Sequence, residues 1–270
     1  MAIPKPSWPP LDGQNAMHAP KMSEGSKRKI KQSDWVFYLL SLTVLIMLLG
    51  WACRWGWAEV LAVGPRMKIE LWQQQKLQPT VQELAEVQEQ LASAQSWNGM
   101  SADIAFERGL VAEWQALQTP VWSASTHDYR NQAIEYFKKA LDLRPSWGMA
   151  WVHLANSLVL NRQLYSGAMN ALEKASILAP LEKGVQQRII WLGLSQWSHL
   201  NEEQRRQLHK IVEYAMRPRS NVAIKAIVDF RLEKEFTRLL SGVQDHKVLQ
   251  RYLKKRERLD KARRNRQNTN

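Results

Sequence analysis

Cysteine is almost absent from this sequence, and so are the short motifs on which many enzymes depend. Cys53 is the only cysteine among 270 residues, so the chain forms no internal disulfide and no cluster of thiolate ligands. It has no phosphate-binding loop, dinucleotide fingerprint, zinc-protease motif, nucleophile elbow or Cys-x-x-Cys pair. His127 beside Asp128, and His153 near Asn156, fix no catalytic geometry and suit surface or capping roles better. We therefore expect a non-enzyme, with no catalytic residue, no metal site and no cofactor.

Strand-like segments are also missing, because no run of alternating β-branched residues lies between hairpin turns. With 45% apolar and 23% charged residues, the chain is not disordered throughout. Its net charge of +13 is unevenly placed: residues 1–34 hold six basic and three acidic groups, residues 35–246 hold 22 and 20, and residues 247–270 hold ten and two. Thirteen tryptophans supply large amphipathic rings of the kind found at membrane and protein interfaces. The sequence predicts an all-α protein with basic ends.

One uncharged apolar segment, residues 35–53, is long enough to cross a bilayer. As a helix, its 19 residues span about 28 Å. Trp35 marks one edge, and Trp51, Trp55 and Trp57 mark the other, where indole rings favour lipid headgroups. Tryptophans at both edges argue against a buried core helix, and the bulky Trp51 argues against a cleaved signal peptide. We interpret the segment as an uncleaved transmembrane helix.

The flanking charges indicate how the anchor is oriented. Five basic residues precede the apolar segment and three follow it within a comparable distance, which places the N-terminus in the cytoplasm and the body outside it. The proline-rich residues 1–34 read as a disordered cytoplasmic tail. We expect a single-pass protein of a bacterial inner membrane with a periplasmic C-terminal domain. The flanking residues are Lys21, Lys27, Arg28, Lys29 and Lys31 before the segment and Arg54, Arg66 and Lys68 after it.

An amphipathic spacer helix is expected over residues 65–98, where apolar residues recur at steps of three and four. Thr80 and Glu83 form a capping box directly after Pro79, which marks a helix start. Packing onto the following helices and formation of a coiled coil both remain open for this segment.

The most specific pattern lies in residues 133–180. A small, large, small, proline spacing occurs twice, displaced by 35 residues, and a helix with apolar residues on one face precedes the second copy. Small residues let a neighbouring helix approach, the large residue fills the space, and proline ends the helix. The copies are Ala133, Phe137, Ala140 and Pro145, then Ala168, Leu172, Ala175 and Pro180, and the preceding helix carries Trp151, Leu154, Ala155 and Leu158.

These residues resemble the tetratricopeptide repeat, a helix-turn-helix unit of 34 residues. The resemblance is good over residues 147–180 and half present before that, with an expected first helix at 101–117 that contains Gly109. It fades after Pro180, since 201–217 lacks the small-large-small spacing. Because a hairpin cannot bury its own apolar face, helices at 201–216 and 220–240 are expected as caps. We therefore predict a tetratricopeptide-like domain over residues 99–244 with C-terminal capping helices.

The resemblance implies that partner proteins bind along the face formed by the first helices. In the better repeat, this face is expected to include residues on the sides of the helix that the repeat pattern does not use. They are Met149, Val152, His153, Asn156 and Val159.

Residues 245–270 are expected to form a basic amphipathic helix with a polar end. Three interpretations remain open: a solvated helix end, a surface for anionic lipid, or a site for a polyanion such as acidic polysaccharide or nucleic acid. Nucleic acid is disfavoured because it requires a cytoplasmic C-terminus. The basic residues concerned are Lys247, Arg251, Lys254, Lys255, Arg256, Arg258, Lys261, Arg263 and Arg264.

The overall layout of basic leader, anchor, tryptophan-rich helical body and basic tail resembles the VpsP family of exopolysaccharide biosynthesis proteins. That resemblance implies a non-enzymatic scaffold or accessory in making or exporting a capsule or biofilm polysaccharide, in contact with polymerase or export components. The alternatives are a general periplasmic membrane-tethered chaperone or assembly factor, and a polysaccharide-modifying enzyme with an unrecognised site.

Overall fold

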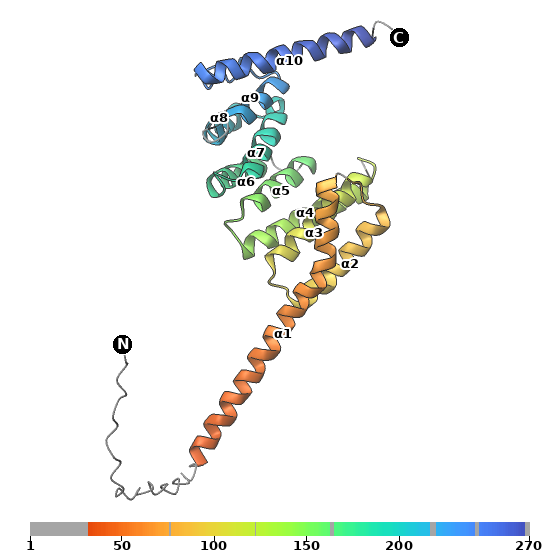
Figure 1. Cartoon of the computed structure of the whole chain (residues 1–270), viewed down its shortest axis with the longest axis vertical. Coiled ribbons are helices and arrows are strands. Elements are labelled where there is room, and N and C mark those ends of the chain that lie inside the picture. Colours follow the sequence, from red (N-terminus) through yellow and green to blue (C-terminus); the bar gives the residue numbers. More distant parts are fainter. Residues whose placement is uncertain are drawn as a thin grey trace, which may run out of the picture. The chain divides into compact units, whose positions relative to one another are not determined.

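The computed structural model describes residues 32–75, 77–121, 123–162, 165–216, 220–240 and 243–267, and every regular element in them is helical (Figure 1). The predicted all-α class is confirmed. Residues 1–31 of the expected N-terminal tail lie outside the described residues. In chain order the elements are α1 (Gln32–Gln75), α2 (Val81–Trp97), α3 (Ala102–Gln118), α4 (Ala124–Leu143), α5 (Gly148–Leu160), α6 (Tyr165–Leu178), α7 (Lys183–Ser195), the short 3₁₀ helix η1 (Trp197–His199), α8 (Glu202–Met216), α9 (Ser220–Asp229) and α10 (Val243–Gln267).

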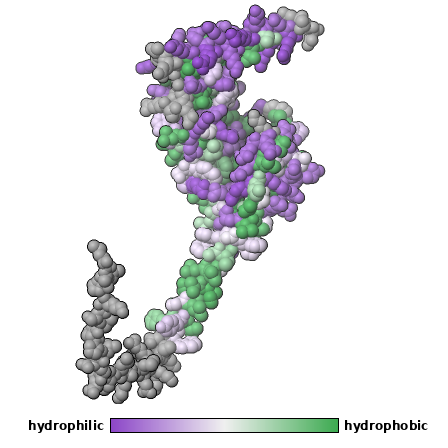
Figure 2. Space-filling model, viewed as in Figure 1, coloured by the Kyte–Doolittle hydropathy of each residue, from purple (hydrophilic) through white to green (hydrophobic). Residues whose placement is uncertain are grey.

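The chain divides into two compact units, residues 1–50 and 51–270. In the described part of the first unit, α1 carries apolar side chains that are all exposed, and it appears as a green rod in Figure 2. Two of its hydroxyls are satisfied within the helix, because Ser41 and Thr43 each donate a 2.8 Å hydrogen bond to a carbonyl one turn earlier. Among the described residues, this helix is long and apolar enough to span a membrane.

α1 continues beyond its apolar segment, and its later part belongs to the second unit. There Ala62 and Trp72 are buried in the same core as the following helices. Arg54 donates hydrogen bonds to the carbonyls of Ser96 (3.1 Å) and Trp97 (2.7 Å), so it satisfies the last turn of α2. Arg66 bonds to the buried Glu107 of α3 at 2.5 Å.

Residues 65–98, expected as one spacer helix, form the end of α1 and the whole of α2. The break has a local cause, because Pro79 disfavours a helical residue before it. The capping box predicted next to it is confirmed: the Thr80 hydroxyl accepts from the Glu83 amide (3.2 Å), and the Thr80 amide donates to the Glu83 carboxylate (2.7 Å). α2 then packs on α3 through Leu84, Val87, Leu91 and Ala94.

Three successive hairpins, α3–α4, α5–α6 and α7–α8, form the body. In the first, a Cβ at Gly109 would lie 2.5 Å from the Phe137 ring, so only glycine allows this approach. The third has the same contact between Gly193 and Leu208. The sequence pattern fades after Pro180, yet the hairpin geometry continues through a third unit.

The expected cap at 220–240 is helical only as far as Asp229, and this part of the prediction is wrong. Arg231 adopts a left-handed backbone with φ 59°, and the Leu232 amide donates to the Ile227 carbonyl at 2.9 Å. That arrangement closes a helix C-terminus. The following turns bury Phe236 and Leu240, so the segment caps the core without being a continuous helix.

α10 completes the described chain and covers α9. Val248, Leu249 and Tyr252 pack against the core, and Arg256 pairs with Glu233 and donates to the Val228 carbonyl at 2.8 Å. The expected C-terminal basic helix is thus present over Val243–Gln267.

Candidate functional site

The first helices of the three hairpins, α3, α5 and α7, line two adjoining cavities. The larger has a volume of about 570 Å³ and the smaller about 290 Å³. Both are lined by His153, Asn156 and Arg188, so the two cavities adjoin, and together we call them the groove. The end of α1 also contributes to the larger cavity through Trp72 and Gln73. The groove therefore lies on the face by which tetratricopeptide-like hairpins present their first helices.

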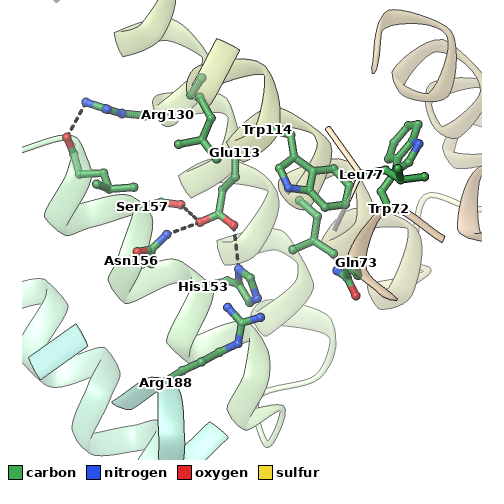
Figure 3. Close-up of a pocket in the computed structure, with 14 residues that line it drawn as sticks. Trp72, Gln73, Leu77, Glu113, Trp114, Arg130, His153, Asn156, Ser157 and Arg188 are labelled. Carbon is green, nitrogen blue, oxygen red and sulfur yellow. Dashed lines mark hydrogen bonds and ion pairs between the residues drawn. The ribbon is translucent and has the colours of Figure 1, made fainter. Parts of the chain in front are cut away.

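A carboxylate from α3 holds the floor of the groove together (Figure 3). Glu113 Oε2 lies 2.7 Å from His153 Nδ1, and Glu113 Oε1 accepts from Asn156 at 2.9 Å and from Ser157 at 2.8 Å. The three partners all belong to α5, so one side chain joins the first helix of one hairpin to that of the next. The Glu113 side chain is 14% exposed and that of His153 is 9% exposed.

The charge state of Glu113 follows from two opposing influences. Burial is the largest and raises the pKa of the carboxyl, but His153 and the hydrogen bonds from Asn156 and Ser157 together outweigh it. The pKa of Glu113 is therefore lowered, and the carboxylate is ionised at neutral pH. The ionised carboxylate thus joins α3 to α5 through contacts with three residues.

Apolar side chains form the rim of the larger cavity. Leu77 is 50%, Leu117 69% and Leu160 39% exposed, although all three line the cavity. Beside them, the rings of Trp72 and Trp114 meet edge to face at 5.4 Å between centroids. Exposed leucines around a hollow are typical of a binding surface, since water is displaced from them when a partner docks.

Two arginines that line the groove give it positive charge. Arg188 is exposed, lines both cavities and makes no hydrogen bond or ion pair with another described residue; Figure 3 shows it extending from α7 towards His153. Arg130 is half-buried and donates to the Leu160 carbonyl at 2.6 Å, and burial followed by the nearby charge of Arg162 lowers its pKa. Arg188 is thus a cation with its hydrogen-bonding capacity available to a ligand.

The residues predicted for the binding face divide into two groups. His153 and Asn156 line both cavities, and Val152 lines the smaller one. Met149 and Val159 line neither, and both pack partly buried against the core. Their role in binding stays a prediction.

Sequence reasoning missed Glu113, Arg188 and the exposed leucines. A signal for Glu113 was present, because it lies one turn after Gly109 and directly after the apolar run Leu110, Val111 and Ala112, where a buried acid needs partners. Arg188 had none, since an exposed basic residue in a helix is ordinary.

The basic residues predicted for polyanion or lipid contact are spread around α10. Arg256 faces the core and is used internally by Glu233. The others, Lys247, Arg251, Lys254, Lys255, Arg258, Lys261, Arg263 and Arg264, are exposed.

Comparison with solved structures shows a likeness in fold. A solved structure described as the human IFIT1 dimer with PPP-AAAA is similar at 16% identity and a TM-score of 0.47, over 66% of this chain and 42% of that one. This chain thus spans less than half the length of that protein. No protein-family model and no curated protein matches the sequence. The layout resemblance to the VpsP family is not shown by any of these comparisons and stays a prediction. The body itself is a stack of helical hairpins that resembles a tetratricopeptide repeat in its arrangement.

Proposed function

We propose that this protein is a membrane-tethered scaffold that binds a segment of a partner protein in the groove, and that it acts by binding and not by catalysis. The observation that carries the proposal is the pair of adjoining cavities across α3, α5 and α7, with exposed leucines on the rim and a hydrogen-bonded carboxylate on the floor. Tetratricopeptide-like repeats use this face for extended peptides or helices.

The chemistry of the groove favours a partner segment with an apolar side chain next to an acidic group. The leucine rim offers apolar surface at the larger cavity. Arg188 lies where the two cavities meet and offers a guanidinium to a carboxylate. A segment that carries both groups can bury its apolar side chain against the leucines and, in the same bound position, accept a charge-assisted hydrogen bond from Arg188.

Peptide display on the full chain in lipid nanodiscs tests this proposal. We expect selected peptides to share an apolar residue near an acidic one. Their binding should weaken at least tenfold in Leu117→Asp and in Arg188→Glu, and should be unchanged in Lys210→Glu, an exposed control on α8. Peptides that bind all four proteins equally would place the binding surface elsewhere and refute the proposal.

We further propose that α1 is an uncleaved anchor with its N-terminus in the cytoplasm. Its exposed apolar side chains support a membrane anchor. The greater number of basic residues before residue 35 supports the orientation. An alkaline phosphatase fusion after Gly99 should be active, because the enzyme matures outside the cytoplasm. An inactive fusion that is produced at normal levels would contradict the orientation.

As the finer proposal, the scaffold serves exopolysaccharide synthesis or export, and the resemblance in layout to the VpsP family supports it. Deletion of the gene should abolish matrix or capsule while general envelope proteins stay at normal levels. The alternative is a general envelope chaperone, for which deletion would reduce unrelated envelope proteins and the purified protein would protect unrelated clients from aggregation.

A further inference from the structure

Five cations form a straight line along α10, which we call the stripe. Its members are separated by steps of four, three, four and three residues. At 100° per residue these positions fall within a sector of about 80°, and at 1.5 Å per residue they extend over about 21 Å. The stripe consists of Lys247, Arg251, Lys254, Arg258 and Lys261.

The stripe points away from the body of the protein. The opposite face of α10 is the packed one, where Leu249 and Tyr252 contact the core, Arg256 pairs with Glu233 and Asp260 pairs with Arg231 at 2.9 Å. All five members of the stripe are exposed, and Figure 2 shows strongly hydrophilic side chains over α10.

The charges of the stripe are not neutralised by the described protein. None of the five forms an ion pair with a described residue. Of the two acidic residues in 247–270, Asp260 is occupied by Arg231, which leaves Glu257. Neighbouring charges of the stripe are about 5 Å apart along the helix axis and repel one another. A polyanion that binds there relieves this repulsion and releases its own bound counterions, and both effects favour binding.

The composition of the stripe disfavours two polyanionic partners. A bilayer surface is bound by helices that insert several apolar side chains, but Val248, Leu249 and Tyr252 already pack on the core, which leaves Leu259 as the exposed leucine of the described α10. Single-stranded nucleic acid is bound by stacking its bases on aromatic rings, and the stripe contains none.

We propose that the stripe binds a linear acidic polysaccharide, whose carboxylate or sulfate groups recur along an extended chain without bases. A single row of cations suits a single row of anions, and guanidinium and ammonium groups both bind carboxylate and sulfate without a pocket. This site is separate from the groove and does not depend on the proposed peptide binding.

The test uses the full chain in nanodiscs of zwitterionic lipid, with polygalacturonate as the probe and neutral dextran as its control. Polygalacturonate should bind at low salt, with affinity that falls as salt rises, and dextran should not bind. The triple variant Arg251→Gln, Lys254→Gln, Arg258→Gln should bind on the order of 100-fold more weakly, because each cation near an anionic surface contributes about a factor of five. Glutamine is a good helix former, so circular dichroism should be unchanged.

A matched variant removes three exposed charges elsewhere: Lys183→Gln, Arg206→Gln and Lys210→Gln. It should keep its affinity within threefold, and Arg258→Lys, which keeps the charge, should do the same. Three outcomes overturn the proposal: no binding of polygalacturonate, equal loss in both triple variants, or tighter binding to a single-stranded oligonucleotide or to phosphatidylglycerol vesicles. Peptide binding in the groove should be the same in all variants, which separates failure of this proposal from failure of the first.

Discussion

Replacing Gly109 by alanine should destabilise the body, although alanine is the better helix former. The new Cβ would lie 2.5, 2.8 and 2.9 Å from three atoms of the Phe137 ring, closer than carbon atoms can approach. The ring cannot turn aside easily, because Phe137 is fully buried and is flanked by Phe106 (5.5 Å between centroids) and His153 (5.4 Å). Alanine gains about 0.5–1 kcal/mol of helix propensity, but overpacking costs about 1–3 kcal/mol. The difference is a net loss of up to about 2.5 kcal/mol in the free energy of unfolding, and we expect about 1 kcal/mol.

Urea unfolding of the full chain in detergent, followed by tryptophan fluorescence, measures this loss. Gly56→Ala is the matched control, because a Cβ at that helical position meets no atom within 4 Å, and it should be neutral or slightly stabilising. Phe137→Leu costs stability by itself, but it should remove most of the additional cost of Gly109→Ala in a double-mutant cycle. The reasoning is refuted if Gly109→Ala is as stable as Gly56→Ala, or if the two substitutions at the contact are simply additive.

Three further predictions concern other contacts. Gly193→Ala should cost less than Gly109→Ala in the same assay, because the atom in its way is a terminal methyl of Leu208 and not a ring; an equal or larger cost would contradict this. Thr80→Ala removes a capping bond and should lower the free energy of unfolding by about 1 kcal/mol, whereas no change in urea midpoint would show that α2 does not need its cap. Glu113→Gln should cost about 2–3 kcal/mol at neutral pH through loss of charged hydrogen bonds. Since folding lowers the pKa of Glu113, the ionised carboxylate stabilises the folded protein above the unfolded-state pKa of about 4.3, and this stabilisation is lost as the pH falls further. The melting temperatures of the wild-type protein and Glu113→Gln should therefore converge only below about pH 4. A difference that stays constant through that range would refute the assignment.

Much of the fold could be predicted because local chemistry decides it. The capping box at Thr80 marks the start of α2, and the spacing of Ala133, Phe137 and Ala140 marks a helix that packs closely on its neighbour. The third hairpin was underestimated because Gln204 and Ile211 stand where the pattern expects small residues, although Gly193 still supplies the close approach.

The end of α9 and most of the groove depend on features that single-sequence reasoning does not contain. Arg231 ends the helix in a left-handed conformation that usually selects glycine or asparagine, so nothing in its identity signals a stop. His153 and Asn156 were found because they lie within the best-matching repeat. Glu113 and Arg188 meet them from other helices, and only the packing of one hairpin on the next brings the four together.

The carboxylate of Glu113 also determines how the groove meets its partner. Because its three bonds to α5 are made within the protein itself, the spacing of the first two hairpins is set before any ligand arrives. Because the groove is preorganised, most of the conformational entropy lost on binding is lost by the partner segment. A partner that is already helical or extended in isolation is therefore favoured over a chemically identical one that must first adopt that conformation.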